Sequence, residues 1–596
     1  MKNHFTAQQK TATERKAGAQ KKVNFYSLLR LAGFAAVVAS IWLWISQGGN
    51  IWPLVTLIAV TAFLALMRIQ QSAQRQLRFY QNILSVNIDE EIRLDYGFVR
   101  EDTGDIYKDG LHAYSGDLDI FGKHSLYRLL NRTQTALGSE RFAHWLANPA
   151  PLETILERQQ ALAESRGHYD WRQNWQATAL LHKNATQHIG ALDTWIKTQI
   201  DPTLLKGLKW KWWAVVTALL LAGWALNLLP LWPLGFSLAV HILVLRRYAS
   251  HIRQLTDQTL NIGSTLVAYA DLMALAGSQS FKGKWWSQQL HSAHEAEGAF
   301  RELGGWFSRL DFRANAYFAL FVGIPSMWDL ICLDALEKWK EKYRDRFPEW
   351  LDSLANIEAL NSMAGHAFAN PEQIIPEVHW GKELEITCKS VGHPLIPAGK
   401  RVCNDFAMSG QGQTVLITGS NMSGKSTFLR TIGINLVLAQ AGGVVPAESM
   451  SCTLMQVFTS MRTQDSLEEN TSSFYAELKR LKQLIGLAGQ ENRIPVFYLL
   501  DEILKGTNSA DRHRGAAALI RQLHPLNASG LVSTHDLELG SWGDSQPYVR
   551  NFNFRSDLSN GQITFDYKLN EGTCSSFNAS ELMRMMGIKV DDDSEN

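Results

Sequence analysis

The feature that most limits how this chain can fold is a set of long apolar runs without a charged residue. The first two, Leu31 to Ile45 and Ile51 to Met67, are separated only by SQGGN. A second pair, Trp212 to Leu229 and Leu231 to Leu245, is split at Pro230. Because a bilayer span needs roughly 17–25 apolar residues, we expect each pair to form a transmembrane helical hairpin. The alternatives are four buried core helices or, for the first run, a signal peptide.

Lysine and arginine residues around both pairs predict their orientation. The short turns carry none, whereas the flanks are basic: Lys2, Lys10, Arg15, Lys16, Lys21, Lys22 and Arg30 before the first pair, Arg68, Arg75 and Arg78 after it, Lys206, Lys209 and Lys211 before the second pair, and Arg246, Arg247 and Arg253 after it. Basic flanks stay on the cytoplasmic side. We therefore expect a multi-pass protein of the inner (cytoplasmic) membrane with its N-terminus and all large parts in the cytoplasm. No small-residue cleavage site follows the first run, which argues against a signal peptide.

The remaining composition excludes several classes of protein. A net charge of +1 with 19% charged residues gives no global signal for a nucleic-acid binder. The five cysteines form no CxxC pair, so neither a zinc site nor a disulfide framework is expected. A third apolar stretch, Ala314 to Leu333, contains Asp329 and is followed by Asp334. Carboxylates are costly in lipid, so this stretch is expected to be a soluble core helix.

The clearest chemical motif runs from Gly419 to Ser426 and reads G-x-x-x-x-G-K-S. It lies between the strand-like run TVLIT and the helical pattern TFLRTIGINLVLAQ. In that context the backbone N–H groups and the helix N-terminus point at phosphate oxygens. Lys425 is expected on the β- and γ-phosphates of ATP, and Ser426 on Mg²⁺. The predicted nucleotide-binding residues are Gly419, Ser420, Asn421, Met422, Ser423, Gly424, Lys425, Ser426, Thr427 and Asp501.

A second motif, VFYLLDE, ends a buried strand with the acidic pair Asp501 and Glu502. Strand ends of this kind face the nucleotide in α/β sheets. Asp501 is expected to hold the Mg²⁺ shell and Glu502 to deprotonate the attacking water. Alternatively, the pair caps the next helix. His535 follows the third strand-like run, GLVST, where it could sense the γ-phosphate or be purely structural.

Together these motifs resemble the MutS family of DNA mismatch-repair ATPases. GSNMSGKST is similar to the family's G-P-N-M-G-G-K-S-T, with Ser420 and Ser423 replacing Pro and Gly. DEILKGTNSADR resembles D-E-I-G-R-G-T-S-T-Y-D-G, and STHDLEL resembles the A-T-H block, which implies a catalytic switch role for His535. TSSFYAELKRL is similar to the S-T-F helix. The resemblance implies that Ser472 reaches the nucleotide of the opposite subunit in a homodimer.

The resemblance extends beyond the nucleotide site. LNRTQTALGSERFAHWL, from Leu130, is similar to the opening of the family's helical core, GHPLI at Gly392 to its R-H-P segment, and CSSFNASELMRMMGI to its S-Y-G-I segment. The family's mismatch-reading domain, with its Phe-x-Glu wedge, would precede the core, where this chain has a basic tail and a hairpin. The resemblance thus implies a membrane-anchored relative without the N-terminal mismatch-recognition domain.

The expected fold class is an α/β P-loop NTPase domain of the ABC/MutS type, joined to an all-α core and lever domain and two transmembrane helical hairpins. The expected segments are a basic tail 1–26, hairpin 27–68, linker 69–114, helical core 115–206, hairpin 207–247, core and lever 248–380, ATPase domain 381–588 and acidic tail 589–596.

The expected function is an ATP-driven, Mg²⁺-dependent dimeric switch at the membrane, related to DNA mismatch repair. An alternative is the ATPase motor of a membrane transport or protein-partner complex, with partners that the sequence does not identify. Non-specific or branched DNA would be contacted by basic stretches such as KGKWW and EKWKEKYRDR. Those charges could equally be solvated helix faces.

Overall fold

The computed structural model describes the chain except residues 50, 183–189, 199–208, 259–261, 421, 462–472, 491–493, 560–561 and 574–596. The chain divides into two compact units. The helical unit comprises Met1–Glu91, Arg132–Arg141 and His168–Ala359, and the α/β unit comprises Ile92–Asn131, Phe142–Gly167 and Leu360–Asn596. Much of the region expected to be a linker and the first part of the helical core therefore belongs to the α/β unit.

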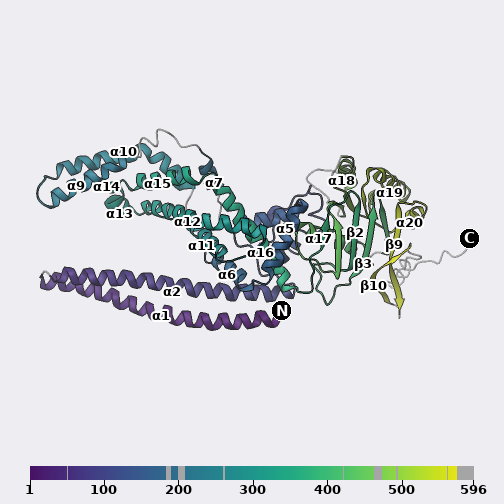
Figure 1. Cartoon of the computed structure of the whole chain (residues 1–596), viewed down its shortest axis with the longest axis horizontal. Helices are drawn as coiled ribbons and strands as arrows, with labels where there is room; N and C mark the ends of the chain where they lie inside the picture. Colours follow the sequence, from purple (N-terminus) through teal and green to yellow (C-terminus); the bar gives the residue numbers. More distant parts are fainter. Residues whose placement is uncertain are drawn as a thin grey trace, which may run out of the picture. The chain divides into compact units, whose positions relative to one another are not determined.

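The first apolar pair forms two very long helices, α1 (Lys2–Gln47) and α2 (Trp52–Leu94), of 46 and 43 residues (Figure 1). In their most apolar windows only 6% and 0% of the residues are buried inside the protein, and both helices are long and apolar enough to cross a membrane. The rings of Phe34 and Phe63 lie 6.0 Å apart between them. Both helices continue far beyond the apolar runs, so the stretches expected to be a basic tail and a linker are largely helical.

The second apolar pair also forms a hairpin, of α9 (Trp213–Ala225) and α10 (Trp232–Gln258). With 13 residues, α9 is about 20 Å long, shorter than the roughly 30 Å hydrocarbon core of a bilayer. Neither helix is among the described helices suited to span a membrane. The expectation that the second hairpin consists of two full spans is not supported.

The third apolar stretch is not a single core helix, and that prediction is wrong. It consists of α13 (Ala316–Phe318), the π-helical η5 (Ala319–Gly323) and α14 (Ile324–Ser326), followed after a break by α15 (Trp328–Tyr343). At the break Met327 has the left-handed φ of 53°, and the chain bends by 73°. Several apolar side chains before the break are exposed, including Phe321 at 70%.

The rest of the helical unit is built around the pair α11 (Ile262–Gly277) and α12 (Lys284–Leu310). Gly263 and Gly304 face each other there, and a Cβ on either would lie within 3 Å of the other's carbonyl oxygen. These glycines therefore permit the close approach of the two helices. The other elements are α6 (Tyr169–Leu180), α7 (Gly190–Lys197), η3 (Lys209–Trp212) and η4 (Asp311–Ala314).

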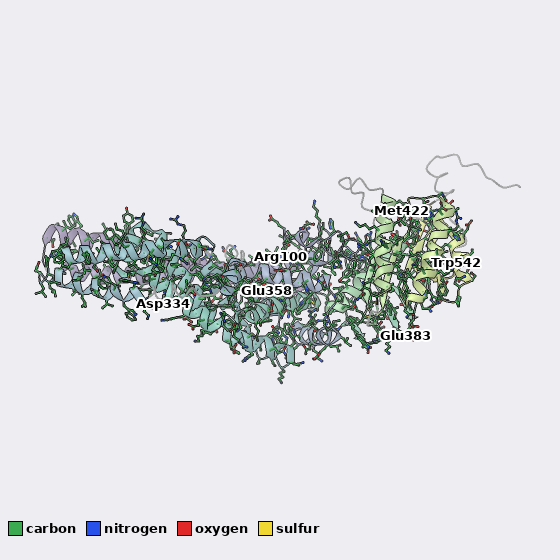
Figure 2. The ribbon with its side chains drawn as sticks, turned by 90° about the horizontal axis from the view of Figure 1, so that it is seen from above. Arg100, Asp334, Glu358, Glu383, Met422 and Trp542 are labelled. Carbon is green, nitrogen blue, oxygen red and sulfur yellow. The ribbon has the colours of Figure 1, made fainter. Side chains whose placement is uncertain are left out.

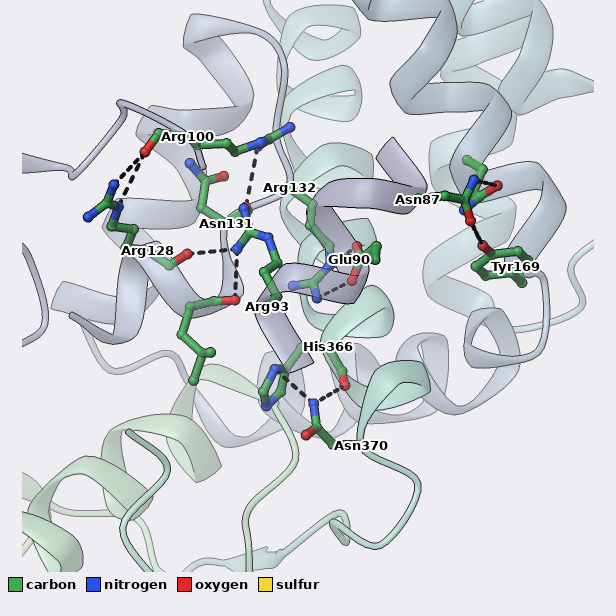
Figure 3. Close-up of polar contacts among 12 residues, drawn as sticks. Asn87, Glu90, Arg93, Arg100, Arg128, Asn131, Arg132, Tyr169, His366 and Asn370 are labelled. Carbon is green, nitrogen blue, oxygen red and sulfur yellow. Dashed lines mark hydrogen bonds and ion pairs between the residues drawn. The ribbon is translucent and has the colours of Figure 1, made fainter. Parts of the chain in front are cut away.

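Buried polar contacts give the LNRTQTALG motif a structural role in the helical unit. Arg132 makes a two-pronged ion pair with Glu90 of α2, with N···O distances of 2.6 and 2.7 Å (Figure 3). The buried Glu358, labelled in Figure 2, accepts hydrogen bonds from the backbone of Gln134 and Thr135, and burial raises its pKa. A Cβ on Gly138 would lie 2.0 Å from the Glu358 carboxylate, so the motif needs glycine there.

The α/β unit contains two sheets, which confirms the expected fold class for the C-terminal part. The four-stranded sheet has the order β1-β5-β2-β3 and the six-stranded sheet the order β10-β9-β4-β8-β7-β6. In the larger sheet only β10 is antiparallel to its neighbour. The strands are β1 (Glu377–His379), β2 (Leu384–Val391), β3 (Asn404–Gly410), β4 (Thr414–Gly419), β5 (Ser449–Thr453), β6 (Gln456–Ser460), β7 (Val496–Asp501), β8 (Ser529–Thr534), β9 (Val549–Ser559) and β10 (Gln562–Glu571).

The helices that follow the strands include α17 (Lys425–Ala441), α18 (Ser473–Ala488), α19 (Ser509–Leu523) and α20 (Leu537–Asp544). The remaining elements are η1 (Asp105–Tyr107), α3 (Leu126–Leu130), α4 (Ala136–Ala147), α5 (Leu152–Arg166), α16 (Phe347–Ala369) and η6 (His524–Leu526). The described cysteines, Cys332, Cys388, Cys403 and Cys452, are free, in agreement with the expectation of no disulfide framework.

A segment expected to lie at the end of the linker packs on the edge strand of the larger sheet. The backbone N–H of Thr459 in β6 donates to the carbonyl of Ala113 at 2.9 Å, and Asp117 accepts a hydrogen bond from the Thr459 hydroxyl at 2.8 Å. Arg480 of α18 donates to the carbonyls of His112 and Ala113, both at 2.7 Å. This segment is therefore an integral part of the α/β unit.

Candidate functional site

The predicted phosphate-binding loop connects β4, an internal strand of the larger sheet, to α17. Gly424 directly precedes the helix with a φ of 106°, a conformation that side chains disfavour. A Cβ at Gly424 would also lie 3.0 Å from the ring of Tyr567. Met422, labelled in Figure 2, is 80% exposed at the surface of the loop. The local conformation thus agrees with the P-loop prediction, while Asn421 lies outside the described residues.

The polar groups of this loop suit an anionic ligand. Lys425 is buried, and its Nζ donates to the carbonyls of Gly419 at 2.8 Å and Ser420 at 2.9 Å. The hydroxyls of Ser420 and Ser423 are buried without a hydrogen-bond partner among the described residues. An unsatisfied buried hydroxyl is unfavourable, and phosphate oxygens would satisfy both groups. Ser426 and Thr427 line a cavity to which Lys425 also contributes.

Asp501 lies at the carboxyl end of β7, as predicted. Its carboxylate accepts a hydrogen bond from the hydroxyl of Ser533 in β8. Because β8 separates β7 from β4, Asp501 is about 10 Å from the P-loop strand at the usual spacing of 4.7–4.9 Å between neighbours. That separation leaves room for a hydrated Mg²⁺ and a phosphate between them.

Glu502 is held in an uncommon backbone conformation at the end of the same strand. Its φ is 50°, and its N–H donates to the Ser533 carbonyl at 3.0 Å. Its carboxylate lies 3.1 Å from Lys505 Nζ and 3.8 Å from His535 Nδ1. Partial burial alone would raise the pKa of Glu502, but the hydrogen bond from Lys505 and nearby positive charges outweigh it and lower the pKa. Glu502 is therefore ionised at neutral pH and able to accept a proton, with His535 close to it.

A cavity of about 590 Å³ brings Glu502 together with the P-loop residues from Met422 to Thr427. This volume lies within the range of small-molecule sites. His393 and Tyr567 also line this cavity. Burial and the charge of Arg430 lower the pKa of His393 to about 4, so its ring is neutral at physiological pH.

Tyr567 was not predicted as a site residue. The pairing of β10 with β9 shifts register between Phe565 and Leu569, and Tyr567 has a φ of 55° within this irregularity. Asn404 fixes the segment by donating to the Tyr567 carbonyl at 3.0 Å and accepting from the Leu569 N–H at 2.9 Å. The irregular strand thereby places the Tyr567 ring beside Gly424 of the P-loop. No sequence motif predicts this position of Tyr567.

The start of α18 contacts the loop that follows Glu502. The buried carboxylate of Glu477 accepts a hydrogen bond from the backbone N–H of Leu504, whose φ is 61°, and burial raises the pKa of Glu477. A Cβ on Gly506 would lie 2.6 Å from Phe474. Ser472 lies outside the described residues, so its predicted role stays a prediction. Glu477 was missed because in sequence it resembles an ordinary polar residue of an amphipathic helix.

Comparison with known proteins agrees with this geometry. The family model for MutS domain V matches residues 415–589, which include the P-loop, the acidic pair and His535. Residues 415–589 therefore belong to the MutS domain V family.

The MutS relatives match only part of the chain. The DNA mismatch repair protein MutS of a Geobacillus species is 32% identical over 240 residues, which are 39% of this chain and 27% of the relative. Endonuclease MutS2 of Bacillus velezensis is 30% identical over 205 residues, which are 34% of this chain and 25% of the relative. The chain thus matches about a quarter of the length of these relatives.

Proposed function

We propose that this chain is a membrane-anchored ATPase of the MutS type that hydrolyses ATP to ADP and phosphate. The observation that carries the proposal is the single cavity shared by Lys425 of the P-loop and Glu502 of the acidic pair. Lys425 would neutralise charge on the β- and γ-phosphates, and Glu502 would accept a proton from the attacking water.

The residues present fit a magnesium ion. Ser426 lines the cavity, and Asp501 is the last residue of β7, two strands from β4 in the sheet; hydroxyl and carboxylate oxygens are ligands that Mg²⁺ prefers. When bound, the ion neutralises charge on the phosphate oxygens. The Ser420 and Ser423 hydroxyls would gain acceptors at the same time, and Lys425 would exchange its loop carbonyls for phosphate. His535, 3.8 Å from Glu502, would sense the occupied site.

Two substitutions test this assignment. Lys425→Ala should abolish ATP binding, whereas Glu502→Gln should keep binding and slow hydrolysis, accumulating the ATP-bound form. Equilibrium binding of a fluorescent ATP analogue and single-turnover hydrolysis separate the two effects. Hydrolysis at the native rate by Glu502→Gln would disprove its assignment as the base.

We further propose that α1 and α2 anchor the protein with its large parts in the cytoplasm and that ATP closes a homodimer through Ser472. The length and exposure of the two helices and their basic flanks support the anchoring. Among the described residues only α1 and α2, and at most the bent pair around Met327, are suited to span a membrane. We favour a switch over a transport motor because the family model that matches residues 415–589 is MutS domain V.

The names of the MutS relatives connect them with DNA mismatch repair, and we propose that this chain binds DNA weakly and without selecting mismatches. The basic stretch EKWKEKYRDR argues against a strong DNA site, because several of its charges are paired. Lys338 lies 3.0 Å from Asp334, which Figure 2 labels, and Arg346 contacts Glu295. Lys340 is buried, 3.9 Å from Glu337.

A further inference from the structure

The helical unit has a second exposed apolar surface, at a tip formed by α9, α10 and the segment 312–328 before the helix break. Neither Trp212 to Leu245 nor Ala314 to Trp328 contains an Asp, Glu, Lys or Arg. The most exposed apolar side chains include Leu219, Leu228, Trp232, Phe236, Leu243 and Phe321, each 67–74% exposed. Contiguous apolar surface of this kind marks a site of contact with a membrane or another protein.

The buried polar side chains shared by α9 and α10 are hydrogen-bonded to one another. His241, Ser237 and Thr217 are buried, and the Thr217 hydroxyl lies 2.9 Å from His241 Nε2 and 2.7 Å from the Ser237 hydroxyl. Trp213 Nε1 donates to Ser237 at 3.0 Å. With Nε2 as the acceptor, Thr217 donates to His241, Ser237 donates to Thr217 and Trp213 donates to Ser237, so each hydroxyl donates once. Internal satisfaction of polar groups is what a hydrocarbon environment requires.

The same histidine stabilises the helix break. His241 Nδ1 lies 2.8 Å from the carbonyl oxygen of Ile324 in α14, next to the left-handed Met327. Breaks inside a membrane are tolerated where side chains satisfy the freed backbone groups. Through its two ring nitrogens, His241 links α10 to both α9 and α14.

The tip and the apolar part of α1–α2 begin at the same level. Asp271 of α11 pairs with Arg75 of α2 and with Arg301 of α12, the latter at 3.2 Å. At 1.5 Å per residue along α2, Met67 at the edge of the apolar run lies about 12 Å from Arg75. Counted in the same way along α12, Phe312 at the start of the tip lies about 16 Å from Arg301.

The apolar run of α2 and the tip lie on the same side of the Asp271 ion pairs, because α2 and α12 are antiparallel (Figure 1). Asn82, further along α2, donates to the carbonyl of Ala177 in α6, and Trp171 of α6 packs on Trp286 at the start of α12. The start of α2 and the end of α12 therefore lie on the same side of the unit.

We propose that the tip inserts into the leaflet through which the α1–α2 hairpin enters the bilayer, turns around Leu228 to Pro230, and does not cross. Acyl chains are its occupant. About 20 Å of α9, and a similar apolar length of α10, is too short for a hydrocarbon core of roughly 30 Å. Lys209, Arg246 and Arg247 flank the apolar runs of α9 and α10 in the sequence, as expected for residues that meet anionic headgroups. This inference rests on the proposed anchoring by α1 and α2.

Cysteine labelling of the full-length protein tests the proposal. Gly48→Cys, Lys209→Cys, Leu228→Cys and Phe321→Cys are each treated with a membrane-impermeant maleimide in intact cells and in inside-out vesicles. The protein with its native cysteines provides the background, and labelling after denaturation in SDS confirms that each added thiol is present. Gly48→Cys should react only from outside and Lys209→Cys only from inside. Leu228→Cys and Phe321→Cys should react at least tenfold more slowly than both from either side.

Each other pattern has a definite meaning. Rapid labelling of Leu228→Cys from outside would show that α9 and α10 cross, which overturns the proposal. Rapid labelling of Leu228→Cys or Phe321→Cys from inside would place the tip in the cytoplasm, which also overturns it. Absence of outside labelling at Gly48→Cys would remove the α1–α2 anchor itself, and is thereby distinguished from failure of the tip alone. Phe321→Cys leaves the α9–α10 hairpin unchanged, so it tests the insertion independently.

Discussion

Replacing Glu477 should slow ATP hydrolysis without weakening ATP binding. The Glu477 carboxylate is the described acceptor for the N–H of Leu504, two residues after the proposed base. Leu504 and Glu502 both have left-handed φ values, 61° and 50°, and such conformations persist only where the surroundings enforce them. In Glu477→Ala the Leu504 N–H would lose this acceptor, and the loop would relax away from the arrangement that points Glu502 into the cavity.

The size of the effect follows from the cost of an unsatisfied buried donor. That cost is about 1–3 kcal/mol, which corresponds to a rate reduction of roughly 5- to 150-fold if the loop must regain its position for each turnover. Glu477→Gln retains a carbonyl oxygen as acceptor and should recover most of the rate. Lys479→Ala, an exposed change on the same helix, is the matched control and should behave as the native protein.

Single-turnover hydrolysis at saturating ATP gives the rate, an ATP-binding titration gives the affinity, and thermal unfolding checks that each variant is folded. Native hydrolysis by a folded Glu477→Ala protein would refute the positioning role. A Glu477→Gln rate as low as that of Glu477→Ala would show that the charge, rather than the accepting oxygen, is what matters.

Three further predictions concern the base, the subunit arrangement and DNA. Lys505→Ala removes the hydrogen bond and the positive charge that lower the pKa of Glu502. Because the base acts when deprotonated, the acid limb of the pH–rate profile should move to higher pH. An unchanged acid limb would exclude Glu502 as the titrating group. Mixing Lys425→Ala and Ser472→Ala subunits should restore activity through one intact composite site per mixed dimer, measured as ATPase rate against mixing ratio; no restoration would indicate self-contained sites. Duplex DNA should bind weakly, and more weakly still as the salt concentration rises. The dissociation constants of matched and mismatched duplexes should differ by less than about tenfold. A larger preference for the mismatch, worth more than about 1.4 kcal/mol, would reveal a mismatch-reading site.

The sequence was most informative where chemistry depends on consecutive residues. The P-loop and the acidic pair are local motifs with fixed neighbours, so the strand, the loop and the helix could be predicted together. The continuation of α2 was also accessible, because Arg68 to Leu94 contains neither Gly nor Pro and nothing there interrupts a helix. The sequence was nevertheless interpreted as a linker over residues 69–114, whereas α2 continues to Leu94.

Other features depend on contacts between distant residues. Hydropathy gave the apolar length of the second hairpin but not where α9 ends, which is set by the turn around Asn227, with a φ of 58°. The break at Met327 needs the His241 contact from another helix. Tyr567 reaches the cavity only through the irregular pairing of β10, and Glu477 gains its role from a loop 27 residues away.

The unbroken helix α2 has a mechanical consequence. Glu90, where Arg132 fastens the helix to the core of its unit, is 23 residues beyond Met67, or about 35 Å at 1.5 Å per residue. Such a rod has a long moment arm: a tilt of about 10° at the lipid end displaces its far end by about 6 Å over that length. Under the proposed anchoring by α1 and α2, thinning or stretching of the bilayer, which changes helix tilt, would be transmitted along α2 to the core of the helical unit.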